Sequence, residues 1–173
     1  MAPAIFLDRD GVINVPVVVN GKSYPPADIK NFRLIDGVKK SIIAFRDAGY
    51  RTIIVTNQPD VATGEQKRSV VEAMHAILRR ELVIDDIYVC YHIDQDACDC
   101  RKPKPGMLID AQRKWNLDLD KSYMIGDRWR DIEAGTAAGC QTIFLDYGYV
   151  EKSPENPDYI IKTLAQSVPL ILS

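Results

Sequence analysis

Short apolar runs rich in β-branched residues alternate with amphipathic segments along this chain, and this alternation constrains the fold more than any other feature of the sequence. The apolar runs predict strands at 4–7, 51–57, 86–91, 122–127 and 141–146. Apolar residues at three- and four-residue spacing predict helices at 37–49, 65–82, 106–116 and 129–139, and a short C-terminal helix near 159–168. Because right-handed crossovers join strands that are separated by helices, we expect a Rossmann-like α/β fold of three layers, α/β/α, with a mainly parallel sheet.

The overall properties of the chain narrow the class of protein. Its 173 residues are enough for a sizeable core, and we expect one domain over 1–173 because no linker divides the sequence. A formal net charge of −2 gives no electrostatic basis for binding nucleic acid or an anionic membrane. Charge interrupts the N-terminal apolar run, so we expect neither a signal peptide nor a membrane span. These features favour a cytoplasmic protein. We expect a monomer, although one sequence does not fix the oligomeric state.

Chemically reactive residues follow several of the predicted strands. Asp8 ends the first strand, Thr56 and Asn57 the second, Cys90 the third and Asp127 the fourth. Any one of them alone could be a turn residue or a helix cap. In a parallel sheet, however, the carboxyl ends of the strands meet at one edge, where ligands bind. The sequence therefore predicts a functional site at this edge.

The acids of this group have a pattern that suits a metal ion and a phosphate. Asp8 and Asp10 stand two residues apart, and Asp127 and Asp131 follow another strand. Like charges this close repel unless a cation lies between them, and hard carboxylate oxygens are suitable ligands for Mg²⁺. The hydroxyl of Thr56 and a nearby lysine, Lys102, would suit phosphate oxygens. Phosphoryl transfer needs a nucleophile, an acid/base, a metal and donors around the transferred oxygens, and all of these are present.

A second cluster predicts a zinc site. One imidazole and three thiols, in a C-x-H…C-x-C pattern, offer a suitable set of four tetrahedral ligands: Cys90, His92, Cys98 and Cys100. The alternative is that Cys90 is a buried strand residue and the others are unrelated loop residues. The loop contains little that could pack, so four bonds to zinc would hold it and the Arg101–Lys102 pair that follows. We therefore expect the zinc to be structural. Cys140 is predicted to be a core residue, and His75 to lie on the surface or at the edge of the core.

The order D-x-D-G, T-N, K-P and G-D-x-x-x-D, which spans nearly the whole chain, resembles the haloacid dehalogenase (HAD) superfamily of phosphohydrolases. The resemblance implies that Asp8 is the nucleophile, which forms an aspartyl-phosphate. It implies that Asp10 protonates the leaving oxygen and then activates water. Thr56 and Lys102 would hold the phosphoryl group. Mg²⁺ would be bound by the side chains of Asp8 and Asp127 and by the backbone carbonyl of Asp10.

The cysteine-rich segment and "FLDRDGVIN" resemble a subgroup that includes the heptose bisphosphate phosphatases and the histidinol-phosphate phosphatases. This implies a small phosphate monoester as substrate, with a heptose bisphosphate favoured and histidinol phosphate as the alternative. Two departures concern the substrate. The gap between His92 and Cys98 is short, as in the histidinol-phosphate enzymes, and Thr63 stands where the heptose enzymes have an arginine. Asp60 could pair with the amine of histidinol phosphate.

The segments between the motifs are too short for a cap domain, so loops must roof the site. We expect the roof to consist of the zinc loop and residues 15–29. Asn57, Arg101 and Arg128 are expected to contact the substrate, and Asp131 to orient Lys102 or the metal shell. Two other classes stay open: a receiver-like phospho-switch, and a zinc-based module that binds nucleic acid.

Overall fold

A six-stranded sheet forms the centre of the computed structural model, which describes residues 1–173. Its strand order is β5-β4-β1-β6-β7-β8, and every neighbouring pair is parallel. The fold is therefore the expected α/β class, and β1 occupies an inner position. The strands span Ala4–Leu7 (β1), Arg51–Asn57 (β4), Asp86–Cys90 (β5), Tyr123–Gly126 (β6), Gln141–Leu145 (β7) and Tyr159–Ile161 (β8).

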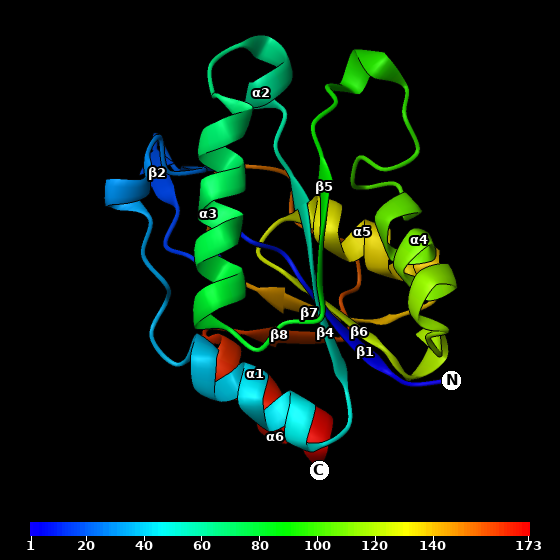
Figure 1. Ribbon diagram of the computed structural model, residues 1–173. Helices are drawn as coiled ribbons and strands as arrows, with labels where there is room; N and C mark the ends of the chain where they lie inside the picture. The colour runs from blue at the N-terminus through cyan, green and yellow to red at the C-terminus, as the bar shows by residue number, and fades with distance from the viewer.

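Helices cover both faces of this sheet, which gives the three layers (Figure 1). One face carries α1, α3 and α6, whereas α4 lies on the other face with α5 beside it. None of the helices combines the length and the apolar composition needed to cross a membrane. The helices span Val38–Asp47 (α1), Asp60–Thr63 (α2), Arg68–Glu81 (α3), Gly106–Trp115 (α4), Trp129–Ala138 (α5) and Ser167–Leu172 (α6), with short 3₁₀ turns at Ile29–Asn31 (η1), Asp94–Asp96 (η2), Leu119–Lys121 (η3) and Leu164–Gln166 (η4).

The first strand shows how the sequence builds these layers. Successive side chains of a strand point to opposite faces. Ile5 and Leu7 pack in the cluster under α1 and α3, whereas Ala4 and Phe6 pack in the cluster under α4. All four residues are fully buried, which explains why the strand reads as a continuous apolar run without polar alternation.

The register of the strands brings the predicted site residues to one edge. Leu7 is paired with Ile54 of β4 on one side and with Ile125 of β6 on the other. The next residue, Asp8, therefore leaves the sheet between the carboxyl ends of β4 and β6, and its N–H donates to the carbonyl of Ile125 at 3.0 Å. This is the switch point at which strand order reverses, where ligands bind in sheets of this type.

One predicted element is wrong. Residues 159–168 do not form a helix, because Tyr159–Ile161 is the sixth strand of the sheet and η4 and α6 follow it. Tyr159 and Ile160 are exposed and Ile161 is buried, as expected for a short strand at the edge of the sheet. The β-branched pair Ile160–Ile161 favours this extended conformation.

The segment at 15–29 folds over the carboxyl edge of the sheet. It contains an antiparallel hairpin of two strands, Val17–Val19 (β2) and Lys22–Tyr24 (β3). The hairpin, α2 and the loop after β5 lie at the same end of the molecule (Figure 1). The two segments that could hold a cap domain contain only the hairpin, η1 and α1 in the first and α2, α3 and β5 in the second. Loops and short elements therefore surround the site, as expected, and part of the segment at 15–29 lines it. The zinc loop does not line it itself, since the lining residues nearest to it are Arg101 and Lys102, which follow the loop.

Candidate active site

A polar cavity of about 230 Å³ opens at the carboxyl edge of the sheet. Only one of the residues around it is hydrophobic, so the cavity suits a charged, hydrophilic ligand. The lining residues come from the strand ends, the hairpin, α2, the segment after the zinc loop and the start of α5: Asp8, Asp10, Lys22, Ser23, Tyr24, Pro25, Asn57, Pro59, Asp60, Arg101, Lys102, Arg128, Arg130 and Asp131.

A buried lysine joins two of the carboxylates. Lys102 Nζ donates to Asp8 Oδ1 at 2.8 Å, to Asp131 Oδ1 at 2.6 Å and to the carbonyl of Val55 at 2.8 Å. Burial and the nearby Asp131 raise the pKa of Asp8 to about 6, although Lys102 opposes this shift. Burial alone would lower the pKa of Lys102, but Asp131 and Asp8 hold it above its usual range. The ammonium is therefore fixed next to Asp8 in its charged form.

Asp127 has the character of a metal ligand. Only 1% of the residue is exposed, and neither of its carboxylate oxygens has a hydrogen-bond partner. Burial, followed by repulsion from Asp8 and Asp131, raises the pKa of Asp127 well above its usual value. Oxygens of these three residues lie within 4.8 Å of one another. Unpaired carboxylates in a buried cluster are costly, and a divalent cation would relieve that cost.

Two glycines allow this crowding. A Cβ on Gly11 would collide with the carboxylate of Asp127, and a Cβ on Gly126 would collide with the side chain of Asp131. Gly11 also has a φ of 92°, in the left-handed region that favours glycine. The glycines of D-x-D-G and of G-D-x-x-x-D are therefore needed for the close approach of the two acidic segments.

Asp10 lines the cavity and is held by three side chains. Arg9 Nη2 donates to both of its carboxylate oxygens, at 2.9 and 3.0 Å. Gln58 Nε2 donates to Asp10 Oδ2 at 2.8 Å, and Asn14 Nδ2 to Asp10 Oδ1 at 2.9 Å. The carboxylate thus has a fixed orientation beside Asp8 while 13% of its side chain is still exposed.

Arg9 and His75 form a contact next to Asp10 that was not predicted from the sequence. Arg9 is completely buried, and its Nη1 lies 3.1 Å from His75 Nε2. His75 is also buried, whereas the sequence analysis placed it at the surface or the edge of the core. Arg9 occupies the middle position of D-x-D, which is the only signal that could have drawn attention to it.

Thr56 and Asn57 lie at the end of β4, as predicted, but their side chains have different partners. Thr56 is buried, does not line the cavity, and its hydroxyl accepts from Gln58 Nε2 at 2.9 Å. Asn57 does line the cavity, yet its amide is occupied by the backbone of Lys102: Nδ2 donates to the carbonyl at 3.0 Å, and Oδ1 accepts from the N–H at 3.1 Å. Asn57 thus fixes the segment that carries Lys102.

Three arginines form a cationic wall of the cavity. Arg101 and Arg130 both pair with Asp94 of the zinc loop, at 2.7 and 3.3 Å. Arg128 is paired with Glu151 at 2.6 Å. The structure thus brings Arg101 and Arg128 to the cavity, as predicted, and adds Arg130, which the sequence analysis did not identify because it sits among other charges in "DRWRD".

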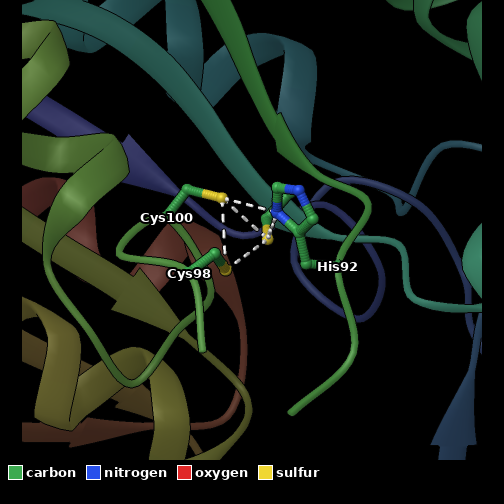
Figure 2. Close-up of side chains that lie close together, drawn as sticks. His92, Cys98 and Cys100 are labelled. Carbon is green, nitrogen blue, oxygen red and sulfur yellow. Dashed lines mark hydrogen bonds between the residues drawn. The ribbon is translucent and has the colours of Figure 1, made fainter. Parts of the chain in front are cut away.

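The predicted zinc ligands lie together at the end of β5. Ligand atoms of Cys90, His92, Cys98 and Cys100 are all within 4.8 Å of one another. The separations of the contacting pairs run from 2.9 Å between the sulfurs of Cys90 and Cys100 to 3.7 Å between the sulfurs of Cys90 and Cys98. Figure 2 shows the side chains of His92, Cys98 and Cys100 pointing toward one centre. Bonds of about 2.3 Å to a tetrahedral ion place neighbouring ligands slightly less than about 4 Å apart, so the donor set fits zinc.

Cys140 is the contrasting cysteine. It is buried in the cluster under α4, away from the other three, as expected for a core residue.

Comparison with known proteins relates the chain to phosphatases. Residues 99–167 match the family model of HAD-hydrolase-like proteins. The D-glycero-β-D-manno-heptose-1,7-bisphosphate 7-phosphatase of Photorhabdus laumondii is 41% identical over 155 residues, which cover 83% of this chain and 79% of the relative. The enzyme of the same name from Escherichia coli K12 is 36% identical over 178 residues, which cover 94% of this chain and 90% of the relative.

Solved structures agree with these relatives. The D,D-heptose 1,7-bisphosphate phosphatase of B. bronchiseptica, complexed with magnesium and phosphate, has a TM-score of 0.78 and 27% identity, with 98% of both chains covered. A HAD-like phosphatase from Mesorhizobium loti has a TM-score of 0.77 and 28% identity, and the match covers 98% of this chain and 86% of that one.

Proposed function

The chain belongs to the family of the D-glycero-β-D-manno-heptose-1,7-bisphosphate 7-phosphatases, within the HAD-like hydrolases, and from this we propose that it removes the C7 phosphate of that sugar bisphosphate. The products are inorganic phosphate and the heptose 1-phosphate, so the enzyme is a phosphoric monoester hydrolase. One observation carries the proposal: the carboxylate of Asp8 lies against the ammonium of Lys102 and beside the unpaired carboxylate of Asp127, at the edge of a polar cavity.

In the first step, a carboxylate oxygen of Asp8 attacks the phosphorus. An aspartyl-phosphate bond forms, and the bond between the phosphorus and the sugar oxygen breaks. Asp10, in its acid form, gives its proton to that oxygen, so that the sugar leaves as an alcohol. Lys102, 2.8 Å from Asp8, offsets negative charge on the transferring group.

In the second step, a water molecule attacks the phosphorus of the aspartyl-phosphate. Asp10, now a carboxylate, takes a proton from this water, and the bond between the phosphorus and the Asp8 oxygen breaks. Inorganic phosphate leaves, and both acids return to their starting states. The same side chain serves both steps because Arg9, Asn14 and Gln58 hold it beside Asp8.

The residues at the site fit Mg²⁺, since buried carboxylate oxygens without partners are suitable ligands for a hard cation. We assign the side chains of Asp8 and Asp127 and the backbone carbonyl of Asp10 to the ion. Bound there, Mg²⁺ would neutralise charge on the phosphoryl oxygens. The carboxylate of Asp131 already accepts from Lys102 Nζ and, at 3.0 Å, from the N–H of Arg128. We therefore assign Asp131 to the orientation of Lys102 and not to the metal.

We assign a structural role to zinc. All four donors of the cluster come from the chain, which leaves no open position for catalysis. The loop that they enclose carries Asp94, and Asp94 holds Arg101 and Arg130 at the cavity. Zinc would therefore keep the cationic wall in place.

That wall supports a substrate with a second phosphate. Lys22 from the hairpin faces the same cavity as the three arginines, whereas Thr63 lies in α2 and does not line it. Because a phosphate dianion needs charged donors, the cations that line the cavity would compensate for the missing arginine at position 63.

Histidinol phosphate is the second candidate, favoured by Asp60. Its carboxylate lines the cavity and could pair with an amine. Comparison of kcat/KM for the two esters decides between them. A preference of about tenfold for histidinol phosphate, about 1.4 kcal/mol of transition-state binding, would reverse the assignment.

The test of the proposed function is phosphate release from the purified protein with Mg²⁺, measured for the heptose bisphosphate, for histidinol phosphate and for simple sugar phosphates. We expect the heptose bisphosphate to be the best substrate and Asp8→Asn to have no turnover while it remains folded. Substantial turnover by Asp8→Asn would refute the covalent route. Wild-type protein that releases no phosphate from any of these esters would refute the function.

A further inference from the structure

The guanidinium of Arg9 connects Asp10 to a histidine on the other side. Nε and Nη2 form a fork on the Asp10 carboxylate, with distances of 3.2, 3.0 and 2.9 Å. The third nitrogen, Nη1, lies 3.1 Å from His75 Nε2. The ring of Phe32 packs on the guanidinium, with 5.8 Å between Arg9 Cζ and the ring centroid. Contacts with Asp10, His75 and Phe32 thus fix the orientation of the buried Arg9 guanidinium.

The direction of the contact with His75 follows from chemistry. A guanidinium donates hydrogen bonds and cannot accept them, so His75 Nε2 must carry no proton. Burial and the charge of Arg9 also lower the pKa of His75 to about 4. The ring is therefore neutral, with its proton on Nδ1, and it accepts from Arg9.

We infer that His75 is a positioning residue for the acid/base Asp10, acting through Arg9. Its acceptor nitrogen pairs with Nη1, the one guanidinium nitrogen that Asp10 does not contact, and so keeps the fork in the plane of the Asp10 carboxylate. Asn14 and Gln58 contact Asp10 directly, so loss of His75 weakens the orientation without removing it. The inference rests on the role proposed above for Asp10.

Two esters with different leaving groups separate this role from a purely structural one. A sugar alkoxide needs a proton from Asp10 in order to leave, whereas p-nitrophenolate is a stable anion and needs little help. The value of kcat/KM reports the steps up to formation of the aspartyl-phosphate. A misoriented Asp10 therefore lowers kcat/KM for the sugar ester selectively, and a general loss of folded protein lowers both values together.

The experiment compares His75→Leu, which has no acceptor, with His75→Gln, whose amide oxygen can take the place of Nε2. The substrates are the heptose bisphosphate and p-nitrophenyl phosphate, with saturating Mg²⁺. We expect His75→Leu to lose about tenfold in kcat/KM for the sugar ester, part of the roughly 10²–10⁴-fold that general acid–base catalysis supplies. His75→Leu should keep the wild-type kcat/KM for the aryl ester. His75→Gln should have a kcat/KM for the sugar ester close to that of the wild type.

Two further variants guard against misfolding. Leu78→Val removes a buried methylene one turn along α3 and should lower stability without changing the ratio of the two kcat/KM values. Arg9→Lys keeps the charge but not the fork, and should reproduce the selective loss. If kcat/KM falls equally for the two esters in His75→Leu, or changes for neither, the inference is overturned while the proposed function stands. Wild-type protein that hydrolyses neither ester would overturn both.

Discussion

Lys102 Nζ lies 2.6 Å from Asp131 Oδ1, and both side chains are almost completely excluded from solvent. Asp131→Ala removes one charge-assisted hydrogen bond from this buried ammonium, which still contacts Asp8 at 2.8 Å, and such bonds are worth about 1.5–3 kcal/mol. We therefore expect Asp131→Ala to lower the free energy of unfolding by about that amount and to lower kcat, because Lys102 loses part of its orientation. Urea denaturation with saturating Mg²⁺ measures the first effect, and steady-state kinetics the second.

The matched control for this variant is Asp110→Ala. Asp110 pairs with Arg113 on the exposed surface of α4, and such pairs are worth about 0.2–1 kcal/mol or less. If both variants lowered the free energy of unfolding by the same small amount, the buried pair would make no special contribution to stability.

Mg²⁺ should stabilise the fold through Asp127. A ligand that binds only the folded state stabilises it by about 2.7 kcal/mol at one hundred times its Kd. We expect Mg²⁺ to raise Tm of the wild type and to leave Tm of Asp127→Asn unchanged. In metal-free buffer we expect Asp127→Asn to have a higher Tm than the wild type, because the introduced amide would not repel Asp8 and Asp131. Asp47→Asn, at the exposed end of α1, should respond to Mg²⁺ as the wild type does.

The cysteine cluster predicts about one equivalent of zinc per chain in metal analysis of the purified protein. Cys98→Ser should lower the zinc content and weaken activity indirectly, because the loop that holds Arg101 and Arg130 loosens. Cys140→Ala removes a buried thiol outside the cluster and should leave the zinc content unchanged. Protein that is free of zinc, stable and fully active would contradict the structural role.

Asp85 gives a prediction on pH. Burial would raise the pKa of this carboxyl, but the N–H of Thr52 and the guanidinium groups of Arg51 and Arg46 hold it below its usual value. A depressed pKa means that the ionised group stabilises the fold above its unfolded pKa, about 3.9. That contribution is lost as the pH falls through the folded pKa.

We expect Asp85→Asn to lower the free energy of unfolding by about 1.5–3 kcal/mol at pH 7, the range for hydrogen bonds to charged groups. The difference from wild type should shrink when the same denaturation is measured below about pH 4. A difference that does not change with pH would show that the charge of Asp85 has no part in it.

Most of the fold could be predicted because its signals are local. The first strand is a continuous apolar run, and α3 has apolar residues at helical spacing. The prediction failed at Tyr159–Ile161, where three residues make a strand only because β7 lies beside them. Such a short segment has no periodicity of its own, and its tertiary partner decides its conformation.

The candidate site could be predicted in its residue types but not in its contacts. The positions of Asp8, Asp127 and Lys102 follow from strand ends and from motif order. The pairing of His75 with Arg9 does not, because the two residues are far apart in sequence and meet only through the packing of α3 against the sheet. For the same reason the sequence could not show that Asn57 is occupied by the backbone of Lys102.

The strand order has a consequence for the nascent chain. β1 precedes the other five strands of this sheet in the chain, yet it lies between β4 and β6, and β6 begins at Tyr123. Until Tyr123–Gly126 leaves the ribosome, one side of the completely apolar β1 has no partner and is an edge open to other chains. Asp8 and Asp127 cannot meet before that moment either. The protein thus brings these two acids together and pairs the second side of β1 in the same event.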